Sequence, residues 1–260
     1  MLLHGLFGQG RNWSTIGKAV QRDHRVTMLD LPDHGRSPWS ERFDYLRIAD
    51  QVADAIEGGG ESGETVTLVG HSMGVKVVMV LALRHPHRVR RLLVADMSPV
   101  RYRGFADGED RSDQERPGIP AYLRAMNRMD LGAVAGREDA DAQLASAVPD
   151  PSVRAFLLQN LRRDDGPSGW RWQANLAMLQ RDLAALGDWP EAELAGVDPY
   201  PGAVLWVAGE QSDYVREEFE PAMDRWFPRH RKVVVKNAGH WLHSEQPEVF
   251  AEILARFAAD

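Results

Sequence analysis

The chain has 260 residues, and its 31 Lys and Arg against 38 Asp and Glu give a formal net charge of −7. This negative charge argues against a nucleic-acid-binding protein, which needs a positively charged face. Hydrophobic residues make up 43% of the chain, which excludes a largely disordered protein and suffices for one well-filled core with or without an inserted subdomain. The absence of cysteine excludes disulfides, thiolate nucleophiles and cysteine zinc sites.

The distribution of apolar residues also limits the possible location of the protein. The longest apolar stretch, residues 77–83, is far shorter than the roughly 20 residues that a membrane span requires. Residues 1–5 contain no basic segment or cleavage site typical of a secretion signal. We therefore expect a cytoplasmic protein that neither crosses a membrane nor binds nucleic acid.

Short β-branched runs alternate with amphipathic segments over the first hundred residues, which is typical of a parallel sheet covered by helices. The expected strands are 1–4, 25–30, 65–70 and 89–96, and the expected helices are 12–21, 45–57 and 73–84. After residue 100, helical patterns run to about residue 186 without a β-branched strand, which predicts an all-helical insertion. The alternation then resumes with strands at 203–208 and 232–236, a helix near 216–227 and a last helix from residue 247. These elements predict an α/β core of residues 1–100 and 190–260 and a helical cap insertion of residues 101–189.

Residues 70–74 form a Gly-x-Ser-x-Gly motif between an expected strand and an expected helix. A strand that turns at once into a helix places Ser72 in a strained conformation, and the flanking glycines let the helix pass close to the neighbouring strands. The Ser72 hydroxyl would then lie at a helix N-terminus, where backbone N–H groups favour developing negative charge. An ordinary turn with an incidental serine is the alternative interpretation.

A serine nucleophile needs a histidine to accept its proton. His240 is the best-placed of the nine histidines, because it lies in a tight loop after the last expected strand, at the sheet edge where catalytic groups gather. His243 is the competitor. Together with His240 and Glu245 it could also be imagined as a metal cluster, although no complete ligand motif accompanies it.

The glycine-rich loop of residues 4–8 follows the first expected strand. A backbone N–H of this loop can join the N–H after the nucleophile to hold an oxyanion, and Leu6 and Met73 are the expected donors. A dinucleotide-binding turn is the alternative, with Asp30 ending the next strand. The glycines at 5, 8 and 10 are not spaced as Gly-x-Gly-x-x-Gly, however, which disfavours that interpretation.

Two aspartates compete to orient the histidine. Asp96 ends the strand that follows the nucleophile helix, and Asp213 follows the next strand. Either of them could instead be a loop-capping residue.

Five segments of the chain resemble motifs of the α/β-hydrolase superfamily, and more narrowly those of bacterial YbfF-type esterases and their mitochondrial relatives. These segments are residues 4–8, 33–38, 70–76, 96–100 and 238–243. The resemblance covers almost the whole chain and implies an α/β-hydrolase fold, with a mostly parallel sheet flanked by helices and an inserted helical cap. It also favours Asp96 as the acid, because that group places the acid at this position. Two features depart from the family: Val75 replaces a usual glycine, and the β-hairpin that usually precedes the first strand is missing, which suggests a truncated start.

The resemblance implies hydrolysis of a small-molecule carboxylic ester or acyl thioester by Ser72, His240 and Asp96, without a cofactor or metal. A serine in place of an aspartate nucleophile disfavours haloalkane dehalogenase and epoxide hydrolase chemistry. Cofactor-free haloperoxidase, carbon–carbon hydrolase or lyase chemistry on the same triad stays open. A non-enzymatic ligand-binding protein of this fold is an alternative of a different class.

Overall fold

The computed structural model describes residues 1–59, 64–102 and 118–259. The chain divides into two compact units, which we call the core unit and the inserted unit. The core unit comprises Met1–Leu31, Asp44–Val100 and Trp189–Asp260, and the inserted unit comprises Pro32–Phe43 and Arg101–Asp188. Among the described helices, none combines the length and the apolar character that a transmembrane span requires.

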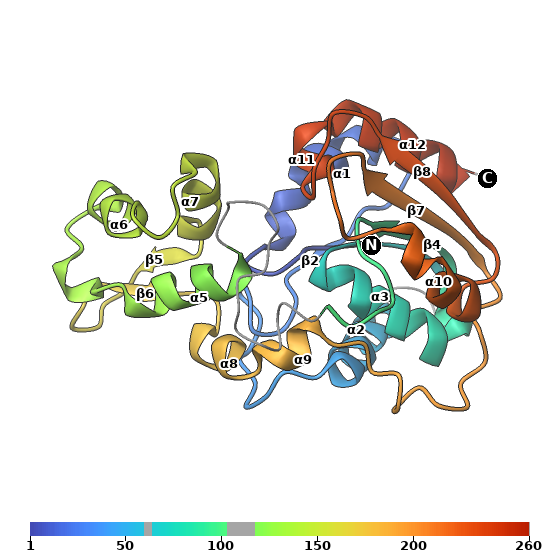
Figure 1. Cartoon of the computed structure of the whole chain (residues 1–260), viewed down its shortest axis with the longest axis horizontal. Helices are drawn as coiled ribbons and strands as arrows, with labels where there is room; N and C mark the ends of the chain where they lie inside the picture. Colours follow the sequence, from blue (N-terminus) through green and yellow to red (C-terminus); the bar gives the residue numbers. More distant parts are fainter. Residues whose placement is uncertain (60–63, 103–117, 260) are drawn as a thin grey trace. The chain divides into compact units, whose positions relative to one another are not determined.

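The core unit contains a six-stranded sheet in the order β2-β1-β3-β4-β7-β8, and all neighbouring strands are parallel (Figure 1). Its strands are β1 (Leu2–Leu3), β2 (Met28–Leu29), β3 (Val66–His71), β4 (Val89–Ala95), β7 (Ala203–Gly209) and β8 (His230–Val235). The six strands that the sequence predicts are therefore all present. Because the strands are parallel, their carboxyl ends share one edge, and the loops that carry Ser72, Asp96 and His240 all leave from that edge.

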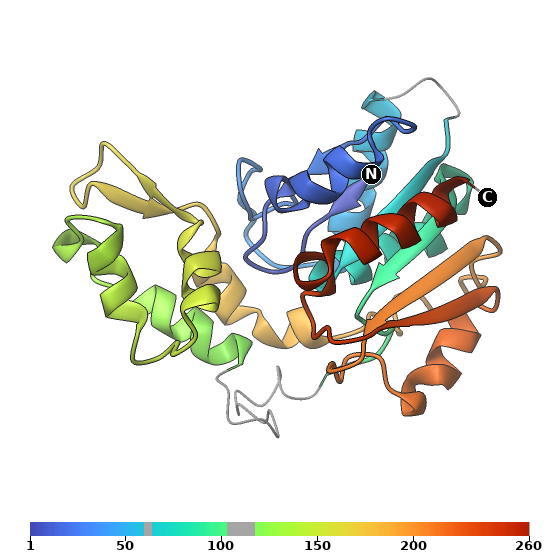
Figure 2. The same ribbon diagram turned by 90° about the horizontal axis from the view of Figure 1, so that it is seen from above.

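Helices cover both faces of this sheet, as Figure 2 shows. One face carries α1 (Ser14–Val20) and α12 (Pro247–Ala259), and the other carries α2 (Tyr45–Gly59), α3 (Met73–Arg84) and α10 (Glu220–Trp226). The remaining helical segments of the unit are short: η1 (Gly10–Trp13), η2 (Pro86–Arg88), η4 (Glu217–Phe219) and α11 (Leu242–Glu245). The buried residues Trp13 and Phe250 pack with Val69, Leu93 and Val207 of three neighbouring strands, so the first face forms one continuous apolar core.

The inserted unit contains helices and a small antiparallel sheet. Its helical elements are α5 (Ile119–Arg128), η3 (Leu131–Ala133), α6 (Arg137–Leu144), α7 (Pro151–Leu158), α8 (Leu176–Arg181) and α9 (Leu183–Gly187). The start of α7 illustrates how sequence sets these helices: the Asp150 carboxylate accepts hydrogen bonds from the Ser152 and Val153 N–H groups, and Pro151 occupies the first turn.

The expectation of an all-helical insertion is wrong, because β5 (Leu161–Arg163) pairs with β6 (Trp170–Trp172). Neither strand contains a β-branched residue, which explains why the pattern was missed. Buried and exposed side chains alternate along β6 instead, because Trp170 and Trp172 are buried while Arg171 is exposed. The Trp170 indole N–H also donates to Val134 O at 2.8 Å.

Residues 32–43 also belong to the inserted unit, although the sequence pattern does not separate them from the core. The buried Asp33 carboxylate explains this placement. It accepts hydrogen bonds from Ser40 N–H and Ser40 Oγ, each at 2.6 Å, and from Asn175 Nδ2 at 3.0 Å. Asn175 N–H also donates to Asp33 O at 2.9 Å. Two segments 142 residues apart are thus tied together within the unit.

Candidate active site

Ser72 lies between β3 and α3, in the strained turn that the motif predicts. Its backbone has φ 51° and ψ −119°, a left-handed region that few non-glycine residues adopt. A Cβ atom at Gly70 would lie 2.5 Å from Gly74 O, and one at Gly74 would lie 2.5 Å from His4 O. Both positions therefore require glycine, because the start of α3 passes directly over the ends of β3 and β1. The turn leaves Ser72 partly exposed at the N-terminus of α3.

The loop of residues 4–8 packs against this turn. A Cβ atom at Gly5 would lie 2.9 Å from His71 Nδ1 and 3.0 Å from Ser72 Cβ. The His4 side chain connects this loop to the segment that follows β2. Its Nδ1–H donates to Gly5 O at 2.8 Å, and its Nε2 accepts from Leu31 N–H at 2.9 Å. These two partners require a neutral imidazole with the proton on Nδ1.

The two expected oxyanion donors come from these two segments. Leu6 follows Gly5, and Met73 is the first residue of α3, whose N–H has no acceptor within the helix. The dinucleotide interpretation loses support, because the Asp30 carboxylate accepts from Gly10 N–H at 2.6 Å. A Cβ atom at Gly10 would lie 2.8 Å from Met28 O, so this glycine allows close packing of the chain on itself.

His240 and Asp96 form a hydrogen-bonded pair. His240 Nδ1 donates to Asp96 Oδ2 over 2.8 Å, and the Asp96 side chain is 0% exposed while that of His240 is 17% exposed. Ser72 N–H donates to Ala95 O at 3.3 Å, which places the serine turn beside the strand end that carries Asp96. The histidine has a polar partner on Nδ1 and partial access to solvent, as a general base requires.

Asp96 has two further donors that the sequence does not reveal. Gly209 N–H donates to Oδ1 at 3.0 Å, and Ser212 Oγ donates to Oδ2, the oxygen that also accepts from His240. Ser212 lies three residues after Gly209, in the loop that follows β7. Asp213 lies one residue further along, and within the described ranges it makes no hydrogen bond with His240. The structure therefore brings together Ser212, Asp96 and His240.

The His240 ring also lies between aromatic neighbours. The Tyr214 ring lies 4.3 Å from it, centroid to centroid, and the His71 ring lies 4.7 Å from it. Tyr214 is itself positioned by Ser98, whose hydroxyl donates to Tyr214 O at 3.0 Å. Residues 96–100 thus supply both the carboxylate and the anchor for the loop that covers the histidine.

Two buried imidazoles lie behind His240. The ring centroids of His71 and His243 are 4.4 Å apart, and those of His243 and Trp13 are 4.5 Å apart. Burial lowers the pKa of His243 to about 3, with a smaller contribution from the charge of His240. Burial, followed by the charges of His243 and His240, also lowers the pKa of His71 well below its usual value. Both imidazoles are therefore neutral at physiological pH.

The metal interpretation of His240, His243 and Glu245 finds no support in the contacts of these residues. His240 binds Asp96, His243 faces the apolar core, and the Glu245 carboxylate accepts from Gly239 N–H. In the part of the chain that the structure describes, no three His, Cys, Asp or Glu residues are arranged to hold a metal ion.

The site contains the components that nucleophilic acyl transfer requires. These are a partly exposed hydroxyl at a helix N-terminus, a histidine hydrogen-bonded to a buried carboxylate, and a turn rich in backbone N–H groups. Comparison with known proteins agrees with this chemistry. The model of the alpha/beta hydrolase family matches residues 1–253.

Individual relatives align over nearly the whole chain. A protein named sn-1-specific diacylglycerol lipase ABHD11 from Mus musculus is 35% identical, over 100% of this chain and 80% of its own length. Esterase YbfF from Escherichia coli K12 is 27% identical, over 100% of this chain and 92% of its own. The solved structure of a marine microorganism esterase superposes with a TM-score of 0.87 at 29% identity, covering 98% of this chain and 93% of that one.

Proposed function

Because the chain belongs to the alpha/beta hydrolase family, we propose that this esterase works through a triad of Ser72, His240 and Asp96. The observation that carries the proposal is the 2.8 Å hydrogen bond from His240 Nδ1 to the buried Asp96, beside the strained turn that presents Ser72. A carboxylate on Nδ1 leaves Nε2 unprotonated in the neutral ring, and this is the nitrogen that must take the serine proton.

In the first half of the proposed reaction, Ser72 Oγ attacks the acyl carbonyl carbon while His240 Nε2 takes the hydroxyl proton. The carbonyl oxygen becomes an oxyanion, which the N–H groups of Leu6 and Met73 stabilise. When the intermediate collapses, the bond to the leaving alcohol or thiol breaks, and His240 returns the proton to that leaving group. The product of this half is an acyl-Ser72 ester.

In the second half, water attacks the acyl-Ser72 carbonyl and gives one proton to His240. The second tetrahedral intermediate collapses to a carboxylic acid, and the proton returns from His240 to Ser72 Oγ. Asp96 orients the ring and stabilises the imidazolium in both halves. The proposed mechanism requires no cofactor or metal.

The proposed substrate is a small-molecule acyl ester or acyl thioester. Relatives named as a diacylglycerol lipase and as an esterase support the ester. An acyl thioester is the alternative substrate, because the same acyl-enzyme forms whether the leaving group is an alcohol or a thiol. In this proposal residues 1–100 and 190–260 carry the chemistry, and residues 101–189 act as a cap.

A serine-directed fluorophosphonate tests the nucleophile. The wild-type protein should be labelled once, and Ser72→Ala should lose both the label and about a thousandfold or more of its turnover of p-nitrophenyl esters. Ser152→Ala removes an exposed hydroxyl from the inserted unit and is the matched control, which should behave as wild type. Labelling and turnover that persist in a folded Ser72→Ala protein would refute the serine mechanism. A parallel panel of acyl-CoA thioesters measures the preference between the two leaving groups.

A further inference from the structure

The ring of Tyr214 lies against the ring of His240, the proposed base. Their centroids are 4.3 Å apart, and the ring planes are tilted by 34°. Two rings this close and this nearly parallel meet with their faces, because an edge-on contact would move the centroids further apart. The Trp241 ring shows the other geometry, with a centroid distance of 5.7 Å and an angle of 64° to the same imidazole. Tyr214 therefore presents its π face to His240.

Backbone hydrogen bonds hold Tyr214 in this position. Tyr214 O accepts from Ser98 Oγ at 3.0 Å, and Tyr214 N–H donates to Ser212 Oγ at 3.4 Å. Ser212 in turn donates to Asp96, the carboxylate that accepts from His240. The position of the Tyr214 ring is thus coupled to the hydrogen bond between the proposed acid and base.

The loop that carries Tyr214 is also tied to the histidine loop. Gln211 N–H donates to Ala238 O at 2.9 Å. A Cβ atom at Gly209 would clash with Gly239 O, so the two loops are in direct contact. Contacts that exist before the reaction need little reorganisation during it, and the contact between the two rings is of this kind.

The charge of His240 changes during the proposed reaction. When Ser72 attacks the acyl carbonyl carbon, Nε2 takes the hydroxyl proton and the ring becomes an imidazolium. The face of an aromatic ring carries partial negative charge and attracts a cation within about 6 Å of its centroid. Tyr214 should therefore favour the imidazolium over the neutral imidazole. An interaction that strengthens as the transition state forms lowers the barrier.

Arginine–aromatic pairs elsewhere in the chain have a similar spacing. The guanidinium carbon of Arg163 lies 4.1 Å from the centroid of the Trp170 ring. That of Arg216 lies 4.8 Å from the centroid of the Phe219 ring. The distance of 4.3 Å between Tyr214 and the imidazole of the proposed base lies between these values. This imidazole is also only 17% exposed, so water weakens the attraction little.

The His71 ring, which also lies beside His240, does not oppose this effect. Their centroids are 4.7 Å apart, and burial, followed by the charges of neighbouring histidines, lowers the pKa of His71 well below its usual value. A neutral neighbour does not repel the imidazolium. The charged ring would thus have the Asp96 carboxylate on Nδ1 and the Tyr214 ring on its face.

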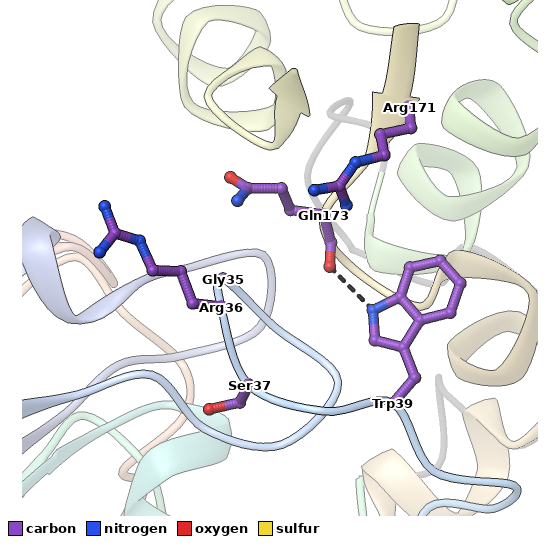
Figure 3. Close-up of a pocket in the computed structure, with 6 residues that line it drawn as sticks. All are labelled: Gly35, Arg36, Ser37, Trp39, Arg171 and Gln173. Atoms are coloured by element: carbon purple, nitrogen blue, oxygen red, sulfur yellow. Dashed lines mark hydrogen bonds between the residues drawn. The ribbon is translucent and has the colours of Figure 1, made fainter. Parts of the chain in front are cut away.

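An exposed aromatic side chain of the inserted unit makes a different contact. Trp39 is 57% exposed and lines a pocket of about 470 Å³ within that unit (Figure 3). Its indole N–H donates to Gln173 O at 3.0 Å, and none of the six residues that line the pocket is a histidine. Exposure alone therefore does not distinguish Tyr214, whereas contact with an imidazole that changes charge does.

We propose that Tyr214 is a positioning residue of this esterase, and that its π face stabilises the imidazolium of His240 while Ser72 gives up its proton. The proposal rests on the proposed triad, because it takes His240 as the base. It assigns the effect to the ring of Tyr214 and not to the hydroxyl.

A series of substitutions at position 214 tests this proposal, because fluorine withdraws charge from the face of a ring and nearly preserves its shape. Tyr214→Phe keeps the face and should retain kcat for p-nitrophenyl esters within about threefold. Tyr214→Leu should lower kcat about tenfold with little change in KM. Monofluoro-, trifluoro- and pentafluorophenylalanine at this position should lower kcat stepwise from the value of Tyr214→Phe to about that of Tyr214→Leu.

Phe219→Leu is the matched control. It removes a ring from the same connection between β7 and α10, where the ring contacts Arg216, and should change kcat less than about twofold. The rate of reaction with the fluorophosphonate should follow the same order as kcat across the series, because labelling also requires transfer of the Ser72 proton.

Equal kcat values across the fluorinated series, in proteins with equal thermal unfolding midpoints, would overturn the proposal, since packing alone would then explain the contact. A loss in Tyr214→Phe as large as that in Tyr214→Leu would assign the effect to the hydroxyl and overturn it too. So would a raised KM with unchanged kcat in Tyr214→Leu. These outcomes leave the proposed triad intact while Ser72→Ala is inactive and unlabelled, whereas an active, labelled Ser72→Ala protein would refute the proposed function itself.

Discussion

The Nε2–H of His71 donates a hydrogen bond to the backbone carbonyl of His240 over 2.8 Å, between residues 169 positions apart. Since His71 immediately precedes Ser72, one buried imidazole connects the serine turn to the loop of the proposed base. The lowered pKa of His71, caused first by its burial and then by its neighbours, keeps the ring neutral. The position of His240 relative to Ser72 therefore depends on a side chain that the proposed reaction does not consume.

Replacement of His71 tests this connection. His71→Phe retains an aromatic ring but loses the donor, and leaves the His240 carbonyl with one fewer partner. We expect kcat for p-nitrophenyl esters to fall about tenfold with little change in KM, because the defect lies in the alignment of the base. His71→Gln restores an N–H donor and should recover part of kcat. Equal kcat values for wild type and a folded His71→Phe protein would contradict this role.

Ser212 is the second positioning residue that the structure identifies. Its hydroxyl shares Asp96 Oδ2 with His240, so Ser212→Ala removes one of the donors that fix the carboxylate. A hydrogen bond to a charged group is worth about 1.5–3 kcal/mol, and the partial loss of alignment should lower kcat on the order of tenfold.

The fluorophosphonate distinguishes this effect from the loss of the nucleophile. Ser212→Ala should still label, only more slowly, whereas Ser72→Ala should not label at all. Wild-type rates of labelling and turnover in Ser212→Ala would show that the hydroxyl does not help to orient Asp96.

The buried imidazoles predict a loss of stability in acid. An unfolded histidine binds a proton near pH 6.5, but His243 in the folded protein does so only near about 3, because burial disfavours its charged form. Between these values the unfolded state binds more protons, so the free energy of unfolding falls as the pH falls. From pH 7 to pH 5 the loss is about 2 kcal/mol for this histidine alone.

Urea unfolding at the two pH values measures this effect. His243→Phe removes the titrating group but preserves contact with Trp13, so the loss between pH 7 and pH 5 should shrink by about 2 kcal/mol. His87→Phe removes an exposed imidazole and serves as the control, with the pH dependence of wild type expected. An unchanged pH dependence in His243→Phe would show that this histidine titrates normally.

The sequence predicted the sheet and the serine turn because local patterns determine both. Apolar runs mark β3 and β4, and positions 70 and 74 require glycine because a Cβ atom at either would lie only 2.5 Å from a backbone oxygen. The length of β2 was less predictable: a strand was expected at residues 25–30, but only Met28–Leu29 pair. Its partner β1 is itself two residues long, so the ladder between them ends there.

Other features depend on long-range contacts that no local pattern reveals. The β5–β6 hairpin lacks β-branched residues, and the link between Asp33 and Asn175 spans 142 positions. Ser212 was missed because nothing in the loop sequence shows which of its side chains turns toward Asp96. Asp213 was the expected alternative because it is a carboxylate that follows a strand, whereas the backbone path of the loop directs Ser212 toward Asp96.

The choice of acid between Asp96 and Asp213 is the most direct test of the proposed triad. Asp96 follows β4, which pairs with β3 of the serine turn, whereas Asp213 follows β7, one strand further away. Adjacent strands lie about 4.8 Å apart, so the strand order alone favours Asp96. Asp96→Asn should lower kcat by up to about 10⁴, and Asp213→Asn by less than about tenfold.

The large effect follows from the donors that surround Asp96. If the asparagine amide NH₂ faces His240, Nδ1 must accept, and the proton moves to Nε2, which then cannot take a proton from Ser72. If the NH₂ turns away, it meets Gly209 N–H, which donates to Oδ1 in the native protein, and two buried donors oppose each other. Neither orientation restores the base. A larger kcat loss in Asp213→Asn than in Asp96→Asn, in proteins with equal thermal unfolding midpoints, would transfer the role of the acid to Asp213.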